Sequence, residues 1–339
     1  MDRRHLLIGA TLAVVLIVAA LALASGGGDG AAATSAHDGV RISPDGSNPL
    51  YPVVGGGRVA WEEHALGGRS SIAVLGAGGG EPSAVSATAS LQFSPSLSGD
   101  RVVWQDRRNG NWDIYLVNLT TGEEMPVCTH PAKQSHPVIS GEIVVWTDER
   151  HGDPDIYAFD LANRTERAIC VQSQTQYNPD VDGDVVVWED YRRGYETAGD
   201  IYAHLLSTGE ERVICDDPRG QWCPSVSDNR IVWQDYRSRI GFDIYLHDLA
   251  TGEERVISSG SGREWLPKIR GDLVVWVDER NRNWDIYAYD LATGTEHPVC
   301  THPDDQGWPS VSDRAVVWLD YRDGRNTVYR AEVPGGRNL

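Results

Sequence analysis

The residues of this chain whose side chains could take part in chemistry are mainly Asp and Arg residues that recur in a fixed order. Six times an Asp lies two residues after a Trp, and an Arg follows two residues after that Asp. Residues i and i+2 of a strand share a face, so each Asp and Arg can form a charge-assisted hydrogen bond. Six copies of one carboxylate cannot all be one active site, and we interpret them as structural pins. The six sets are Trp104, Asp106 and Arg108; Trp146, Asp148 and Arg150; Trp188, Asp190 and Arg192; Trp233, Asp235 and Arg237; Trp276, Asp278 and Arg280; and Trp318, Asp320 and Arg322.

Motifs of known catalytic and metal sites are absent or belong to repeated turns. The sequence contains no G-x-S-x-G, H-E-x-x-H, C-x-x-C or phosphate-binding P-loop pattern. The tripeptide RGD (270–272) and the calcium-like DVDGD (180–184) both fall on a turn that reads SGD or DGD elsewhere. We therefore predict no catalytic residue, no metal site and no cofactor.

The cysteines follow the same repetition. Four of the five share one repeat position, so they lie in separate repeats and cannot bridge one another: Cys128, Cys170, Cys215 and Cys300. We interpret them as small buried residues. The fifth, Cys223, is close enough to Cys215 in the sequence for a disulfide, and this pairing is left open.

Composition excludes some classes of partner. The chain has 339 residues, with 30 Lys and Arg against 49 Asp and Glu, and a formal net charge of −19. Without a basic surface to neutralise phosphates, nucleic acid is excluded as a partner. A content of 40% hydrophobic residues, with 12 Trp and 13 Tyr, is enough for a folded core.

The first 37 residues are typical of export. Residues 6–24 are apolar or small and follow Arg3 and Arg4, which predicts a hydrophobic helix over 1–24 with the rest of the chain outside the cytoplasm. This helix is either an uncleaved membrane anchor or a signal peptide cut between Ala24 and Ser25. Residues 25–37 are predicted to be a flexible linker. The membrane is thus a partner through the N-terminal segment only.

The remainder is one repeat in seven copies. A Trp that closes an apolar run recurs at 61, 104, 146, 188, 233, 276 and 318, at intervals of 42 to 45 residues. Each copy contains four short runs rich in Val, Ile, Trp and Tyr, separated by Gly, Asp and Asn turns. This predicts an all-β fold, a single seven-bladed β-propeller of four-stranded antiparallel blades over 38–333, with a tail at 334–339. The last copy lacks a fourth strand, so GVRIS (39–43) should close its blade.

The consensus WxDxR…DIYxxxLxTGEE resembles the TolB-like propeller repeat of surface proteins from methanogenic archaea. The resemblance covers nearly the whole chain after residue 38, although the first copy departs, with WEEHA at 61–65. It implies a surface-exposed propeller without a settled activity.

A ligand would be expected on the propeller face that carries the longer loops. A Gln three residues before the first-strand Pro should ring the central channel there: Gln92, Gln134, Gln176, Gln221 and Gln306, with Glu264 in the sixth place. Aromatic rings lie beside this ring or in the loops: Trp112, Trp222, Trp265, Trp284 and Trp308. Amides and flat rings suit a sugar or a peptide. The alternative is that the Gln residues bond neighbouring blades and the Trp residues pack between them.

These observations predict a non-catalytic extracellular or cell-surface module that binds an envelope protein or glycan. Asn118 and Asn163 begin candidate N-glycosylation sequons on equivalent turns. The alternatives are an exported propeller enzyme acting on polysaccharide, as a lyase or hydrolase, and a purely architectural envelope component.

Overall fold

A computed structural model of the chain describes residues 38–65, 67–194, 199–260, 262–313 and 315–332. The predicted hydrophobic helix, the linker and the tail lie outside the described residues. No helix in the described ranges is long and apolar enough to cross a membrane.

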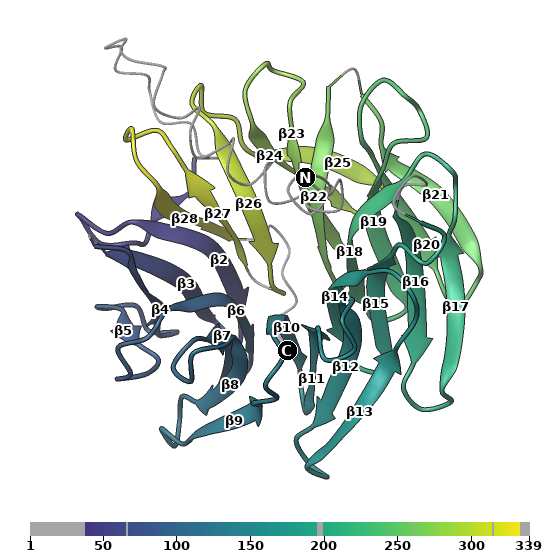
Figure 1. The fold of residues 1–339 in the computed structure, drawn as a ribbon. Coiled ribbons are helices and arrows are strands. Elements are labelled where there is room, and N and C mark those ends of the chain that lie inside the picture. The colour runs from purple at the N-terminus through teal and green to yellow at the C-terminus, as the bar shows by residue number, and fades with distance from the viewer. Residues whose placement is uncertain (1–37, 66, 195–198, 261, 314, 333–339) are drawn as a thin grey trace, which may run out of the picture.

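The described residues form seven four-stranded antiparallel sheets around a common centre, as predicted (Figure 1). Blade 1 contains β2 (Pro49–Gly55), β3 (Arg58–Ala65), β4 (Arg69–Leu75) and β5 (Ser83–Ala84); blade 2 contains β6 (Gln92–Ser98), β7 (Arg101–Asp106), β8 (Asp113–Asn118) and β9 (Glu124–Cys128). Blade 3 contains β10 (Gln134–Ser140), β11 (Ile143–Asp148), β12 (Asp155–Asp160) and β13 (Thr165–Cys170); blade 4 contains β14 (Gln176–Asp182), β15 (Val185–Asp190), β16 (Asp200–Leu205) and β17 (Glu210–Cys215). Blade 5 contains β18 (Gln221–Ser227), β19 (Arg230–Asp235), β20 (Asp243–Asp248) and β21 (Glu253–Ser258); blade 6 contains β22 (Glu264–Arg270), β23 (Leu273–Asp278), β24 (Asp285–Asp290) and β25 (Thr295–Cys300). Blade 7 contains β26 (Gln306–Val311), β27 (Ala315–Asp320), β28 (Thr327–Glu332) and β1 (Val40–Arg41).

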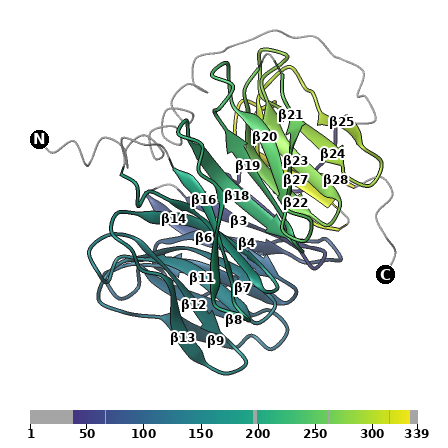
Figure 2. The ribbon, with the colours of Figure 1, turned by 90° about the vertical axis from the view of Figure 1, so that its right-hand side faces the viewer.

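The hydrophobic core lies between adjacent blades. One cluster joins Val103 and Ile114 of blade 2 to Val144 and Trp146 of blade 3, and equivalent clusters recur around the ring. The repeat Trp is fully buried in every blade, and full burial of a large apolar side chain contributes about 1.5–3 kcal/mol. In a view turned by 90°, β9 and β13 lie at one end of the molecule and β21 and β25 at the other (Figure 2).

The N-terminal strand closes the ring, as the sequence predicts. β1 pairs antiparallel with β28, with Val40 opposite Arg330 and Arg41 opposite Tyr329. The backbone N–H of Val328 donates to Ser43 Oγ at 3.0 Å. Gly39 approaches so closely that a Cβ there would overlap the Trp318 ring, and its φ is +65°. Two chain ends distant in sequence therefore share one blade, which leaves no open edge at the join.

Candidate binding face

The longer loops and the connections between blades lie on one face of the propeller, here called the long-loop face. In blade 2 the loop 107–112 and the connection 129–133 both reach this side, where Gln134 N donates to Trp112 O at 2.8 Å. In blade 2 the first strand, β6, begins on the long-loop face and the second, β7, ends on it, because Gln92 pairs with Asp106. Residues at these strand ends are therefore the candidates for contact with a partner.

The Gln side chains predicted to ring the channel are not exposed to solvent. All five Gln side chains are fully buried, with none of their surface exposed. Gln92 shows why: its Oε1 accepts from Ile72 N of blade 1 at 3.1 Å, and its Nε2 donates to Asp106 at 3.0 Å. Gln134 Nε2 donates to Ala132 O of the blade connection at 2.7 Å. Gln92 thus bonds the neighbouring blade, as the alternative interpretation expects, whereas the Oε1 atoms of Gln134, Gln221 and Gln306 have no hydrogen-bond partner among the described residues. All five amides are enclosed, so a ligand on the described surface does not reach them.

Glu264 replaces the Gln in blade 6 and is equally buried. Neither of its carboxylate oxygens makes a hydrogen bond of normal geometry among the described residues. Burial raises the pKa of Glu264 to about 8, and the nearby carboxylates of Asp278 and Asp243 add to the rise, while Arg280 opposes it. The raised pKa favours the neutral form of this carboxyl near pH 7.

The six Trp-Asp-Arg sets share the same three hydrogen bonds to a buried Asp, and we call them pins. In blade 2, Trp104 Nε1 and Arg108 Nη2 donate to Asp106 Oδ2 at 2.9 and 2.6 Å, and Arg108 N donates to Oδ1 at 2.9 Å. The guanidinium carbon lies 3.8 Å from the centre of the Tyr115 ring. Burial opposes the ionised form of Asp106, but the hydrogen bonds from Arg108 and its other donors outweigh it and lower the pKa to about 2. Each Asp has no exposed surface, so its donors account for its recurrence.

The cysteines support these pins. Cys128 Sγ accepts from Arg150 Nη2 of the next blade at 3.4 Å, and burial raises the pKa of this thiol to about 12. All five cysteines are free thiols, so Cys215 and Cys223 are not paired. Cys215 instead contacts Arg237 Nη2 at 3.0 Å.

Three of the five candidate tryptophans come together. The ring centres of Trp265 and Trp284 lie 5.1 Å apart, and each lies 6.3 Å from Trp308. Tyr51 of blade 1 meets Trp308 at 5.8 Å. We call these four residues the tryptophan cluster. Trp265 is 9% exposed, and the other three are half-buried.

The other two candidate tryptophans lie elsewhere on the face. Trp112 contacts Phe93 at 5.3 Å, and Trp222 contacts Phe242 at 5.6 Å.

The cluster lies where a recurring hydrogen bond between blades is missing. In four blades the residue after the repeat Trp is polar and accepts a hydrogen bond from the next blade: Glu62 from Ser94 N at 2.7 Å, Gln105 from His136 N at 3.0 Å, Glu189 from Cys223 N at 2.7 Å and Gln234 from Leu266 N at 3.0 Å. Blade 3 carries Thr147 there, whose hydroxyl has no partner among the described residues. Blades 6 and 7 carry Val277 and Leu319, both fully buried. Those apolar side chains cannot accept this bond, and aromatic rings occupy the same region.

A cavity of about 270 Å³ opens beside the cluster, lined by Glu279, Arg282, Asn283, Trp284 and Asp305. The indole Nε1 of Trp284 donates to Glu279 Oε1 at 3.1 Å, and its backbone N donates to Asp305 Oδ1 at 3.0 Å. Burial raises the pKa of Glu279, against the lowering effect of Arg263. Apart from Trp284, these residues carry no motif by which the sequence alone identifies them. The signal available was their difference from the matching loop of blade 2.

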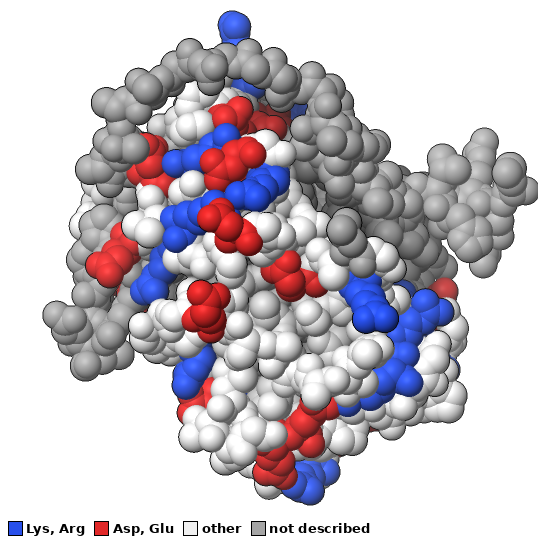
Figure 3. All heavy atoms as spheres, turned by 90° about the vertical axis from the view of Figure 1, so that its left-hand side faces the viewer, with Lys and Arg blue, Asp and Glu red and all other residues white. Residues whose placement is uncertain are grey.

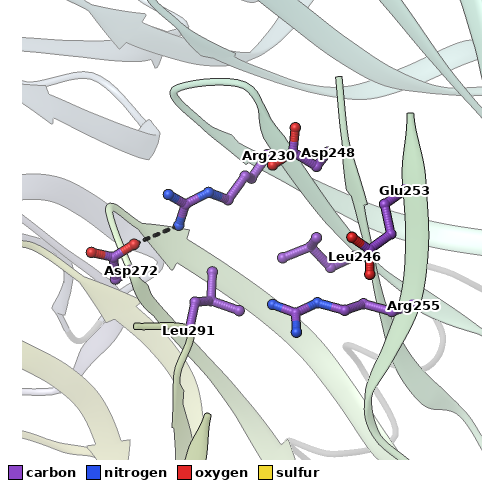
Figure 4. Close-up of a pocket in the computed structure, with 7 residues that line it drawn as sticks. All are labelled: Arg230, Leu246, Asp248, Glu253, Arg255, Asp272 and Leu291. Carbon is purple, nitrogen blue, oxygen red and sulfur yellow. Dashed lines mark hydrogen bonds and ion pairs between the residues drawn. The ribbon is translucent and has the colours of Figure 1, made fainter. Parts of the chain in front are cut away.

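A second cavity, of about 280 Å³, lies between blades 5 and 6 on the opposite face (Figure 4). Arg230 spans it and pairs with Asp272 at 2.7 Å. The same link between blades recurs as Arg58 with Asp100 and Arg101 with Glu142. We therefore assign this cavity to the packing of the blades.

The remaining motif residues lie in turns. Arg270 of the RGD sequence pairs with Asp182 of blade 4 at 3.2 Å and with Asp313 of blade 7 at 3.0 Å, and so links first-strand ends around the channel. The sequon residues are on the face opposite the long loops, with Asn163 exposed and Asn118 half-buried. The surface in Figure 3 carries basic and acidic side chains interspersed.

Comparisons with known proteins support the fold alone. No family model matches the chain, and no curated protein matches it. Among solved structures, TolB from Acinetobacter baumannii is similar with 16% identity and a TM-score of 0.54, over 75% of this chain and 66% of that one. An oligogalacturonate lyase in complex with manganese is similar with 18% identity and a TM-score of 0.65, over 87% and 93%.

A third neighbour is the β-propeller domain of the Trilobed protease from Pyrococcus furiosus, with 13% identity and a TM-score of 0.67, over 86% of this chain and 99% of that one. It is described as having an open velcro topology, whereas β1 closes the last blade here. The chain thus has a TolB-like propeller fold, which occurs in both TolB proteins and enzymes.

Proposed function

We propose that this protein is a non-catalytic binding module of the cell surface or extracellular space, whose long-loop face contacts an envelope protein or glycan. One observation carries the proposal: among the described residues, three tryptophan rings meet only in blades 6 and 7, and a polar cavity opens beside them. Half-buried aromatic rings next to fixed polar groups are typical of recognition surfaces. The apolar N-terminal segment and the resemblance to archaeal surface propellers support this location.

The recurring carboxylates favour binding over catalysis. Each Asp of the six pins is fully buried and held by several donors, so it serves the blade rather than a substrate. Among the described residues, no group of three or more His, Cys, Asp or Glu side chains could hold a metal ion.

An exported enzyme acting on polysaccharide is the second candidate, because one solved neighbour is an oligogalacturonate lyase. Release of unsaturated or reducing ends from polysaccharides on incubation with the protein would favour this candidate and contradict ours.

The binding role is tested with the full chain against envelope fractions of its own source. Trp112→Ala combined with Trp284→Ala removes two half-buried rings from the long-loop face. Val256→Ala is the control, because Val256 is 43% exposed on the outer strand β21. We expect the double variant to lose binding of proteins or glycans and the control to keep it. Equal binding by all three proteins would refute recognition through these loops.

A further inference from the structure

We infer that the cavity beside Trp284 binds one pyranose ring of a neutral glycan. This inference rests on the proposed binding role and names the ligand class for one site of the long-loop face. It follows from the chemistry of the lining, from a comparison with the matching loop of blade 2, and from the size of the cavity.

The lining combines one flat ring with planar polar groups. A pyranose presents an apolar face of C–H groups, which stacks on an indole, and a rim of hydroxyls, which donate and accept hydrogen bonds. Glu279 and Asp305 each use one carboxylate oxygen to hold Trp284 in place. Among the described residues, no hydrogen bond occupies Glu279 Oε2 or Asp305 Oδ2. These two oxygens can accept from sugar hydroxyls, and the exposed Arg282 can donate to them.

The loop of blade 2 provides an internal comparison. Asn111 and Asn283 anchor the two loops identically, with Nδ2 donating to the following Asp at 2.9 and 2.8 Å. Each also donates to the backbone oxygen of the equivalent His at 2.9 Å. The two tryptophans therefore occupy the same place in their blades, and any difference in binding comes from their neighbours.

Those neighbours have opposite charges. Arg107 and Lys133 stand where blade 6 has Glu279 and Asp305. The Arg107 guanidinium lies 5.9 Å from the centre of the Trp112 ring, and Lys133 is paired with Glu149 at 2.7 Å. Blade 2 thus places a cation near its ring, whereas blade 6 places two carboxylates beside Trp284 and has Arg282 where blade 2 has Gly110.

The two carboxylates also restrict the ligand. A uronate would bring a third negative charge beside Glu279 and Asp305, with Arg282 as the single cation of the lining, and like charges at short range repel. Neutral sugars avoid this repulsion. The volume of about 270 Å³ lies just below the usual range for ligand pockets, which suits a single ring with the rest of the glycan outside.

The test follows the indole N–H resonance of Trp284 in the ¹⁵N-labelled full chain, assigned through Trp284→Ala. The probes are neutral hexasaccharides of glucose, mannose and N-acetylglucosamine, and hexagalacturonate as the acidic counterpart. We expect at least one neutral probe to shift this resonance and hexagalacturonate to leave it unchanged. Trp284→Ala should weaken calorimetric binding of that probe about tenfold or more.

Glu279→Arg tests the charge argument, because it installs the residue that blade 2 carries. It should abolish neutral-sugar binding, while Val256→Ala on the outer strand β21 leaves that binding unchanged. An unshifted Trp284 resonance with every neutral probe, or a shift with hexagalacturonate alone, would overturn the inference. If envelope binding still depends on the loop tryptophans in that case, the binding role stands and only the neutral-glycan assignment fails. If that binding is independent of them as well, the proposed function also fails.

Discussion

The buried Glu264 makes the stability of this propeller depend on pH, and Glu264→Gln should remove that dependence. The folded pKa is about 8, against 4.5 for an unperturbed Glu. Between these values the folded state keeps a proton that the unfolded state releases. The contribution of this group is therefore fully present below pH 4.5 and is lost as the pH rises through 8. At 1.36 kcal/mol per pKa unit, the loss is about 3–5 kcal/mol.

Gln is the residue that five other blades use at this position, so the substitution fits the site. Urea unfolding of both proteins should show equal free energies near pH 4.5 and a growing advantage for Glu264→Gln up to pH 9. The converse variant, Gln306→Glu, should create a new decline with pH in blade 7. Asp278, Asp243 and Arg280 face the carboxyl and are unchanged, so their contributions cancel in the comparison. Parallel pH profiles for the wild type and Glu264→Gln would refute the reasoning.

Three further predictions concern the pins, the closure and the thiols. Asp148→Ala removes the buried acceptor of Trp146 Nε1 and Arg150, although Arg150 keeps Glu166 and Cys128 as partners. It should lower the free energy of unfolding by about 3 kcal/mol, measured by chemical denaturation. A loss under 1 kcal/mol would contradict a buried pin. Gly39→Ala places a Cβ against the Trp318 ring at a residue with positive φ. It should lower the melting temperature and speed the hydrogen exchange of the β1 and β28 backbone amides. Unchanged hydrogen exchange would contradict tight closure of the ring. All five cysteines should react with an alkylating reagent in denatured protein without reductant, and fewer than five adducts by mass spectrometry would indicate a disulfide.

The sequence alone determined the architecture, because the repeat supplies the same local information seven times. The spacing of the Trp residues gave the blade length, and the missing last strand predicted the closure by residues 39–43. The pairing of Asp with Arg followed from the alternation of side chains along a strand. The recurrence of the Asp also indicated a structural role, since each Asp has the same partners in its own blade.

The tertiary structure decided which candidates meet and which are exposed. Spacing placed the Gln residues at the channel, but burial depends on the blade that packs against them, and they proved fully enclosed. Likewise, Trp265, Trp284 and Trp308 belong to two blades, and only the geometry between blades brings their rings within 6.3 Å. A repeat pattern describes what the copies share. The candidate site arises from residues that differ between copies, such as Glu279 and Asp305, whose proximity depends on how the ring assembles.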